Sequence, residues 1–436
     1  MHMIKLKESI VKRILVTVLL AVLSFSAFAA GQQEAAAGSG EAKDVKLTMA
    51  SWSVREDRFS DYFEALKTDF EAANPGITIE FAGYPYGELK KQVLIMANAG
   101  QSPDIIQSER GWYSSFVDGG YVAELDDLLG VEYLAEVYPA ILGDMKVDGK
   151  VYGVPWIASP FVMFYNKALF AEAGLADKAP ASYEEAMMYA EKLSALKDKD
   201  GNAIYGLGQS TASVPVSGSA VLSMFFSYGG GFRDASGNID VINAGNKAAL
   251  EALKDMHASK YNPEGAKLKD LRNLFAIGRL GMYFDTLWGI GGAYAINPDI
   301  QGSVGVTNPL SGAGAPAGSS LEAHMLLVAE DSANKEAAVK FIKFATSPEQ
   351  MGKYVEIAPF LFPKADQVDG NPGYQSNPGI APVLTYADTI HSIEKNPEME
   401  NVFLAMTTAA QSVTVGSMSA DEALVNLDKE LKFLLK

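Results

Sequence analysis

Hydrophobic residues recur with two different periods along the first third of the chain, one typical of strands and one typical of helices. The order of the segments with these periods predicts an α/β fold. Apolar residues occupy every second position over 45–49 and again over 77–81, which is the period of a strand. Between them, apolar residues recur at helical spacing over 59–70. A helix over about 88–99 and a short strand over 104–106 follow. This β-α-β-α order predicts a lobe built on a largely parallel sheet.

A second set of signals lies between residues 148 and 174. The Asp148-Gly149 pair separates two short apolar runs and predicts a two-residue hairpin turn, because Gly tolerates positive φ. Pro155 is expected to end the second strand of that hairpin. The continuous apolar run 161–165 predicts a strand buried on both faces. Asn166 is expected to cap a short helix that Gly174 stops.

The second half of the chain is richer in helical patterns. Ser182 with Glu185, and Ser419 with Glu422, have the spacing of capping boxes in front of apolar helical stripes. About 400 residues in the mature chain exceed what one hydrophobic core usually holds, so two lobes are expected.

The first residues predict export. A basic start is followed by an apolar stretch, 14–28, which is about half the length needed to span a bilayer. Ala27-Phe28-Ala29 has the form of a cleavage site, with the cut expected before Ala30, so residues 1–29 are interpreted as a signal peptide. Residues 30–44, rich in Gly, Ala, Gln and Glu, are expected to form a flexible linker. The chain has no cysteine to carry a lipid anchor, which predicts a free periplasmic protein.

Charge and composition exclude several classes of function. The formal net charge is −17, and without residues 1–29 the chain would carry 32 basic and 52 acidic residues, or −20. Nucleic acid and anionic lipid are therefore unlikely partners. The four histidines have no metal-ligand spacing, and neither a G-x-S-x-G elbow nor a cysteine nucleophile is present. We expect no metal, no cofactor and no catalytic chemistry.

The run from Asp148 to Gly174 also resembles the "DGK-YG-P … YNK-LF-EAG" segment of family 1 extracellular solute-binding proteins, which are sugar receptors of ABC importers. Further resemblances lie at 74–77 ("NPGI"), 100–105 ("G-x-x-PDI"), 278–288 ("G-x-x-A-M … W") and 334–349 ("NKEAA … TSPE"). Position 281 departs from that pattern, because Gly281 stands where the family usually has Ala.

The resemblance implies an α/β, two-lobed periplasmic-binding-protein fold of type II, with the ligand in a cleft and strands crossing between the lobes. The crossings are placed near Ala158, His324 and Pro363. The N-terminal lobe would comprise residues 45–158 and 324–362, and the C-terminal lobe residues 159–323 and 363–436. A monomer that delivers a saccharide to membrane permeases is the implied function.

Candidate ligand contacts follow from the chemistry of sugars, whose faces pack on aromatic rings and whose hydroxyls bind carboxylates, amides and arginine. Trp52 and Trp112 follow strands, where ligands of open α/β sheets bind. Trp288 matches the family's stacking tryptophan, and Phe403 aligns with another stacking position. The candidates are Trp52, Arg55, Glu56, Gln107, Glu109, Trp112, Trp156, Ser159, Asp285, Trp288 and Phe403.

Two observations keep other ligands open. Charged ligand contacts of the family's maltose receptors align with Gly111, Trp112 and Ser159, which argues against maltose itself. Arg55, Arg58 and Arg110 leave room for a phosphosugar, and a polyamine or peptide is a further alternative within the same receptor class. A secreted glycosidase, which needs only two correctly spaced carboxylates, is the alternative from a different class.

Overall fold

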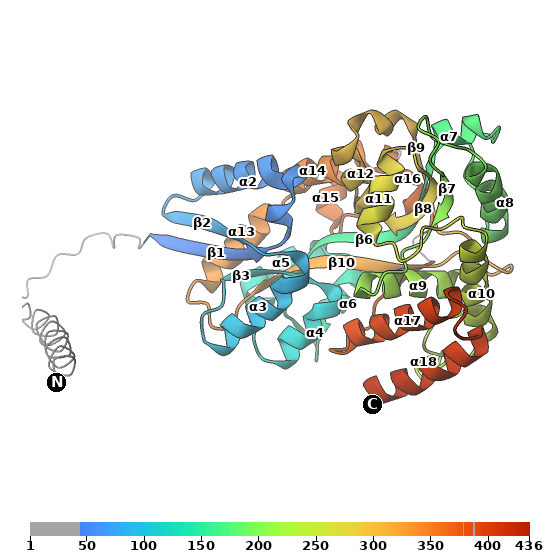
Figure 1. Cartoon of the computed structure of the whole chain (residues 1–436). Coiled ribbons are helices and arrows are strands. Elements are labelled where there is room, and N and C mark those ends of the chain that lie inside the picture. The colour runs from blue at the N-terminus through green and yellow to red at the C-terminus, as the bar shows by residue number, and fades with distance from the viewer. Residues whose placement is uncertain (1–43, 378, 387–388) are drawn as a thin grey trace, which may run out of the picture. The chain divides into compact units, whose positions relative to one another are not determined.

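The computed structural model describes residues 44–377, 379–386 and 389–436 (Figure 1). The predicted signal peptide, and all but Asp44 of the predicted linker, lie outside these residues. Over the described ranges, no helix combines the length and apolarity needed to cross a bilayer.

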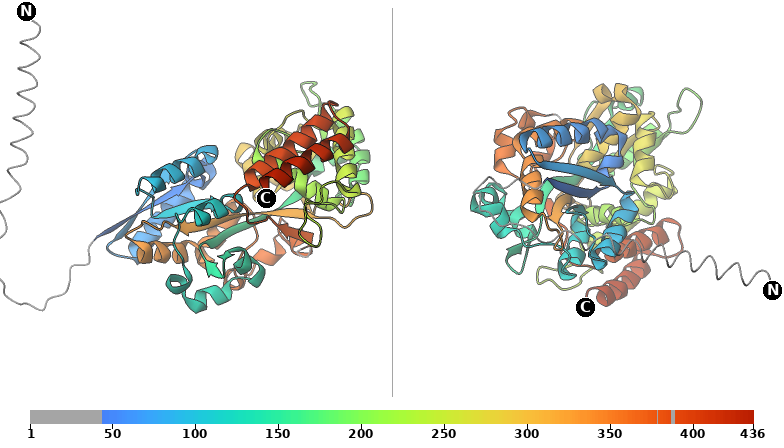
Figure 2. Two further views of the ribbon diagram at one scale, coloured as in Figure 1. Left: turned by 90° about the horizontal axis from the view of Figure 1, so that it is seen from below. Right: turned by 90° about the vertical axis from the view of Figure 1, so that its left-hand side faces the viewer.

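The first lobe follows the predicted strand and helix order. Strands β1 (Val45–Ser51), β2 (Ile77–Gly83) and β3 (Ile105–Glu109) form a parallel group in the order β2-β1-β3. Helices lie on both sides of these strands (Figures 1 and 2). The helices are α2 (Ser60–Ala73), α3 (Tyr86–Asn98), α4 (Arg110–Asp118), α5 (Asp126–Glu136), α6 (Pro139–Asp144), α13 (Lys335–Ala345) and α14 (Pro348–Ile357).

One sheet continues from the first lobe into the second, in the order β2-β1-β3-β10-β6-β8-β7. The long strands β6 (Val154–Asn166) and β10 (Ser319–Val328) pair antiparallel at its centre and run between the two lobes (Figure 1). Strands β7 (Tyr205–Gly208), β8 (Leu280–Thr286), β9 (Val304–Thr307) and β11 (Ile390–Ser392) complete the sheet.

The predicted crossing points meet at this centre. Ala158 lies opposite Ala323, and Ile157 lies opposite His324. Ala158 also exchanges two backbone hydrogen bonds with Leu361, two residues before the predicted third crossing. Backbone segments that are far apart in sequence are therefore hydrogen-bonded where the lobes join.

The signals between 148 and 174 are confirmed with one exception. Strands β4 (Lys146–Val147) and β5 (Lys150–Val151) form the hairpin, with φ of 51° and 83° at the Asp148-Gly149 turn. Asn166 accepts a hydrogen bond from the Leu169 amide and begins helix α7 (Lys167–Glu172), and Gly174 has φ of 67° after its end. The exception is Pro155. It does not end the hairpin but is the second residue of β6, beside a register shift, where a strand tolerates a missing N–H.

The second lobe packs many helices around its strands, and α17 lies beside α18 (Figure 2). The capping box of Ser419 and Glu422 is confirmed at the start of α18. At α8, Ser182 accepts from the Glu185 amide, but the Glu185 carboxylate bonds the Ala181 amide instead of that of Ser182. The helices are α8 (Tyr183–Ser194), α9 (Pro215–Ser227), α10 (Ala244–Ala258), α11 (Leu268–Ala276), α12 (Ile290–Ile296), α16 (Ala381–Leu384), α17 (Met399–Thr414) and α18 (Ala420–Leu434).

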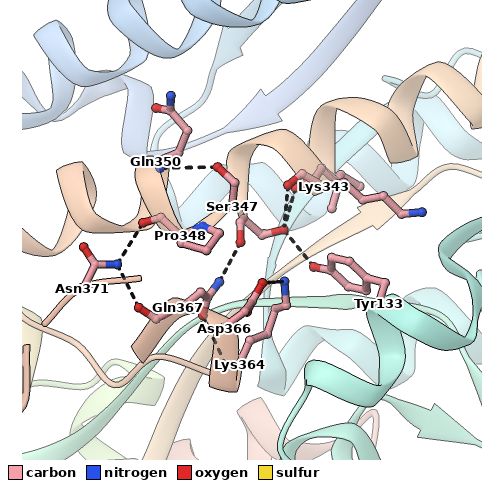
Figure 3. Close-up of polar contacts among 11 residues, drawn as sticks. Tyr133, Lys343, Ser347, Pro348, Gln350, Lys364, Asp366, Gln367 and Asn371 are labelled. Carbon is pink, nitrogen blue, oxygen red and sulfur yellow. Dashed lines mark hydrogen bonds and ion pairs between the residues drawn. The ribbon is translucent and has the colours of Figure 1, made fainter. Parts of the chain in front are cut away.

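The segment after Pro363 differs from the predicted lobe assignment. Its short helix α15 (Ala365–Asp369) is held to first-lobe elements: the Gln367 side-chain amide donates to the Thr346 carbonyl at 2.8 Å, and the Lys364 ammonium lies 4.2 Å from the centre of the Tyr133 ring. Figure 3 shows that Asn371, just after this helix, also donates to the Pro348 carbonyl. Residues 363–371 therefore pack on the first lobe, although the sequence assigned them to the second. Proline and lysine at this point carry no pattern that distinguishes one lobe from the other.

Candidate functional site

A cavity of about 420 Å³ is lined by residues from both lobes. Its walls come from the loop after β1, the end of β3, the central strands, the starts of α9 and α11, and the turn after β8. The lining residues are Trp52, Ser53, Glu56, Arg58, Phe59, Tyr86, Glu109, Ile157, Val214, Val216, Lys267, Leu268, Lys269, Arg272, Thr286, Trp288, Glu322, His324, Tyr354 and Ala358.

Trp52 enters the cavity because β1 ends directly before it and a short 3-10 turn, Ser53–Arg55, follows. Gln107, buried in the neighbouring strand β3, holds this turn: its side-chain amide donates to the Ser53 hydroxyl at 2.8 Å, and its carbonyl accepts from Ser51. Gln107 therefore supports the loop and does not itself line the cavity.

Trp288 approaches from the second lobe, in the 3-10 turn Leu287–Gly289 after β8. Its amide donates to the Ser159 hydroxyl at 3.2 Å, and its carbonyl accepts from the Arg58 guanidinium at 3.3 Å. The His324 ring lies between the two tryptophans, with ring centres 4.8 Å from Trp52 and 4.4 Å from Trp288. An aromatic wall thus crosses from one lobe to the other.

Two carboxyl groups line the cavity near this wall. Glu109, the last residue of β3, lies directly opposite His324 of β10. Burial, reinforced by the charge of Glu322, raises the pKa of Glu109 to about 8. Burial also raises the pKa of Glu322, whose carboxylate accepts a short hydrogen bond from Ser219. Burial, with a contribution from Arg58, lowers the pKa of His324 to about 3, so this imidazole is neutral at physiological pH.

Two arginines of the lining are already paired. Arg58 bonds the Glu56 carboxylate at 2.8 and 2.9 Å. Arg272 donates two parallel hydrogen bonds, of 2.6 and 2.9 Å, to the fully buried Asp285. Burial by itself lowers the pKa of Arg272, but the charge of Asp285 raises it by more. Asp285 is thus committed to Arg272 and to the Thr286 amide, and it does not line the cavity.

Of the predicted site residues, the structure brings four to the cavity wall and places seven elsewhere. Trp156 is fully buried beside Tyr354, and Phe403 is buried in the core of the second lobe. Arg55 is exposed, and its stem covers Gly83. Those at the wall are Trp52, Glu56, Glu109 and Trp288; those elsewhere are Arg55, Gln107, Trp112, Trp156, Ser159, Asp285 and Phe403.

Trp112 lies just outside the cavity, in contact with Trp52 at 5.4 Å between ring centres. Its indole N–H donates to Glu400 of α17 at 3.0 Å, and Glu400 also forms an ion pair with Lys90 of α3. This cluster lines a neighbouring surface groove that shares Tyr86 with the cavity.

Several wall residues escaped the sequence analysis as ligand contacts. Glu322 and His324 are two positions apart in β10, so their side chains lie on the same face of the strand. They come close to Glu109 only because β10 pairs with β3. The residues missed were Phe59, Tyr86, Lys267, Lys269, Arg272, Glu322, His324 and Tyr354, whereas the sequence named Arg58 only as an arginine for a phosphosugar. The one available signal in the sequence was the spacing of two between residues 322 and 324, which predicts that they share a face of a strand. This spacing does not tell which strand lies alongside.

Comparison with known proteins agrees with this architecture. The putative binding protein BAB2_0491 of Brucella abortus is 27% identical over 424 residues, covering 92% of this chain and 96% of the relative. The diacetylchitobiose binding protein DasA of Streptomyces coelicolor is 25% identical, with 86% and 87% covered. The structure of maltose-bound MalE3 of T. maritima superimposes with a TM-score of 0.80 at 24% identity, covering 89% of this chain and 100% of that one.

A family model described as bacterial extracellular solute-binding protein matches residues 56–352. That range begins just after the turn Ser53–Arg55, and it contains both central strands and the turn that carries Trp288. The chain is therefore a member of the bacterial extracellular solute-binding protein family.

Proposed function

We propose that this protein is the extracytoplasmic receptor of an ABC importer, which captures a mono- or oligosaccharide in the cavity between its lobes and delivers it to membrane permeases. One observation carries the proposal: tryptophans from both lobes, Trp52 and Trp288, line a cavity that also presents carboxyl groups. Aromatic faces suit the C–H patches of a sugar ring, and carboxylates suit its hydroxyls. The volume lies in the range typical of small-molecule sites.

The relatives support a saccharide. Their names include a diacetylchitobiose-binding, a maltotriose-binding and an arabinooligosaccharide-binding protein. Members of this family bind solutes and are not enzymes, which argues against a glycosidase. We propose that residues 1–29 are a signal peptide cleaved before Ala30 and that the mature monomer is free in the periplasm.

Ligand capture would work by closure of the lobes. Arg58 of the first lobe reaches the Trp288 carbonyl, and a Cβ added at Gly291 of α12 would lie 2.6 Å from both the Arg58 guanidinium and the Ile357 carbonyl. Such close approach exists only when the lobes are together. A ligand that touches both walls binds this arrangement better than an open one and shifts the population toward it.

A thermal-shift and calorimetric screen of the mature protein tests the proposal. The panel contains gluco-, manno-, arabino- and chito-oligosaccharides of one to four units, with glycerophosphodiesters, phosphosugars and short peptides for comparison. The proposal expects at least one saccharide to raise the melting temperature in a concentration-dependent way. Stabilisation by a phosphorylated compound or a peptide alone would contradict it.

A further inference from the structure

Of the three carboxyl groups that line the cavity, Glu56 is paired with Arg58, whereas Glu109 and Glu322 lack a cationic partner. Among the ion pairs of the described residues, neither Glu109 nor Glu322 takes part. The Glu322 side chain is held in place by Ser219, which itself bonds Ser320, so hydroxyls orient this carboxylate without neutralising it. Glu322 is only 7% exposed, and a buried carboxylate without a countercharge is costly.

Backbone pairing brings these groups together with the ring of His324. Glu109 faces His324 across the β3–β10 pair, and Glu322 lies two residues before His324 on the same face. Diagonal neighbours in such a pair lie roughly 7–8 Å apart. His324 is 7% exposed, lines the cavity, and its Nδ1 has no hydrogen-bond partner among the described residues. The Nδ1 atom is itself inaccessible to solvent, so the groups that face this part of the cavity are the carboxyls of Glu109 and Glu322 and the ring of His324.

The electrostatics show that this part of the cavity is short of positive charge. The charge of Glu322 hinders the ionisation of Glu109, and Glu400 adds to the rise in the pKa of Glu109. Lys90, Arg110 and a hydrogen bond from Tyr86 act in the opposite direction but do not cancel the effect of burial. Lys90 is bound to Glu400, and Arg110 to Asp144 at 2.6 Å.

The positive groups of the lining are not available to these carboxyls. Arg58 and Arg272 are paired with Glu56 and Asp285. Lys267 and Lys269 flank the first residue of α11, and both are exposed to solvent. The buried side of the lining is thus acidic, whereas its free lysines lie on the solvent side.

We propose that the cavity binds its ligand through a protonated amine, which donates to Glu109 and Glu322 and lies against the rings of Trp52 and Trp288. An ammonium group has three donors and no acceptor, which matches two carboxyl groups that lie on one face of the sheet and accept hydrogen bonds. Its charge supplies the missing countercharge, and aromatic rings attract a cation at about 6 Å or less. In combination with the proposed saccharide receptor, on which this part rests, the ligand is an amino sugar; a polyamine would share the same chemistry.

Calorimetric titration of the mature protein at pH 7 with a matched disaccharide series tests the inference. The series is the β-1,4 disaccharide of glucosamine, N,N′-diacetylchitobiose and cellobiose, which differ at C2 as ammonium, acetamide and hydroxyl; spermidine and putrescine form a separate arm. The glucosamine disaccharide is expected to bind at least about tenfold more tightly than cellobiose. Binding of polyamines without any sugar would retain the amine site and refute the saccharide receptor.

Substitution of each carboxyl group by an amide of nearly the same shape tests whether its charge is needed for amine binding. Glu322→Gln and Glu109→Gln should each reduce the affinity for the amine about tenfold more than the affinity for cellobiose, because the amide keeps an acceptor for hydroxyls but carries no charge. Lys267→Ala, which removes a positive charge from the solvent side, should leave amine binding equal or tighter. Circular dichroism melts establish that each variant folds.

Three results would overturn the inference. Neutral sugars that bind as tightly as the amine would refute it and keep the saccharide receptor. A loss of binding in Lys267→Ala with none in Glu322→Gln and Glu109→Gln would indicate an anionic ligand. A failure of every sugar and every amine to bind would overturn both proposals.

Discussion

At the scale of single residues, Trp288 is the side chain through which the second lobe contributes an aromatic surface to the cavity. It is partly exposed, its backbone is fixed from both sides by Ser159 and Arg58, and its ring packs on His324. In the closed arrangement these contacts hold the ring against His324, so the side chain needs no further ordering to contact a ligand.

We therefore expect Trp288→Ala to weaken binding of the best ligand by roughly 2 kcal/mol or more, the range of a buried aromatic hot spot. Titration calorimetry measures the effect. Trp156→Phe is the matched control, because Trp156 is fully buried outside the cavity and should change stability more than affinity. Unchanged affinity in a folded Trp288→Ala protein would remove this residue from the site.

The raised pKa of Glu109 predicts that the stability of the unliganded protein depends on pH. Its folded pKa of about 8 lies above the ordinary value of 4.5, so the folded state binds the proton more tightly than the unfolded state. The stability that this group contributes is complete below pH 4.5 and is lost as the pH rises toward 8. The difference between the two pKa values corresponds to a loss on the order of 4 kcal/mol at pH 8.

Chemical denaturation of wild type and Glu109→Gln between pH 5 and 8 measures this loss, because the amide cannot titrate. The difference in unfolding free energy between variant and wild type should grow with pH. His324, with its pKa lowered to about 3, acts in the opposite sense: its contribution to stability is lost as the pH falls below 6.5. A difference that stays flat from pH 5 to 8 would contradict the role assigned to Glu109.

At the scale of elements, three helices meet across the lobes beside the cavity. Glu400, in the first turn of α17, accepts from the Trp112 indole of α4 and forms an ion pair with Lys90 of α3. The Lys90 and Glu400 side chains are 20% and 31% exposed, so water weakens the pair only in part. This contact joins α17 to the first lobe without touching the ligand cavity.

Glu400→Ala should therefore favour the open arrangement by about 1 kcal/mol and weaken ligand binding roughly fivefold, although the residue lies outside the cavity. Titration calorimetry and small-angle scattering of the unliganded protein measure the two effects. Lys432→Ala, which breaks an exposed pair with Asp428 within α18, is the control and should change neither. Equal affinities in the two variants would show that the cluster has no part in closure.

At the scale of the whole molecule, the described residues form two lobes joined at β6, β10 and the backbone near Leu361. A hydrophobic cluster runs from the first lobe into the strands β6 and β8 and the helices α11 and α12. The remaining second-lobe helices share a separate cluster. Motion between the lobes would turn about the backbone of β6, β10 and the segment near Leu361, which connect them.

Ligand should reduce the radius of gyration of the mature protein and raise its melting temperature. A free ligand concentration a hundredfold above the dissociation constant adds about 2.7 kcal/mol of stability. Small-angle scattering with and without the ligand measures closure, and Gly291→Leu provides a variant that cannot close, because the new side chain would meet Arg58 and Ile357. A ligand that binds but leaves the scattering unchanged would refute closure and keep the binding site.

What the sequence determined by itself is local in physical origin. The Asp148-Gly149 hairpin, the Asn166 cap, the Ser419 capping box and the alternation of β1 each depend on residues a few positions apart, where backbone geometry and near-neighbour hydrogen bonds decide the outcome. The family resemblance, which added the two-lobed fold, came from such local motifs.

The tertiary structure decided which polar groups are free to bind. Asp285 and Arg272 have the chemistry of ligand contacts, yet the fold turns each toward the other. Trp112 is occupied by a glutamate 288 residues away, and Glu322 and His324 reach the cavity because β10 pairs with β3. A side chain's partners depend on strand pairing and lobe contact between distant segments, and neither is encoded in spacing along the chain.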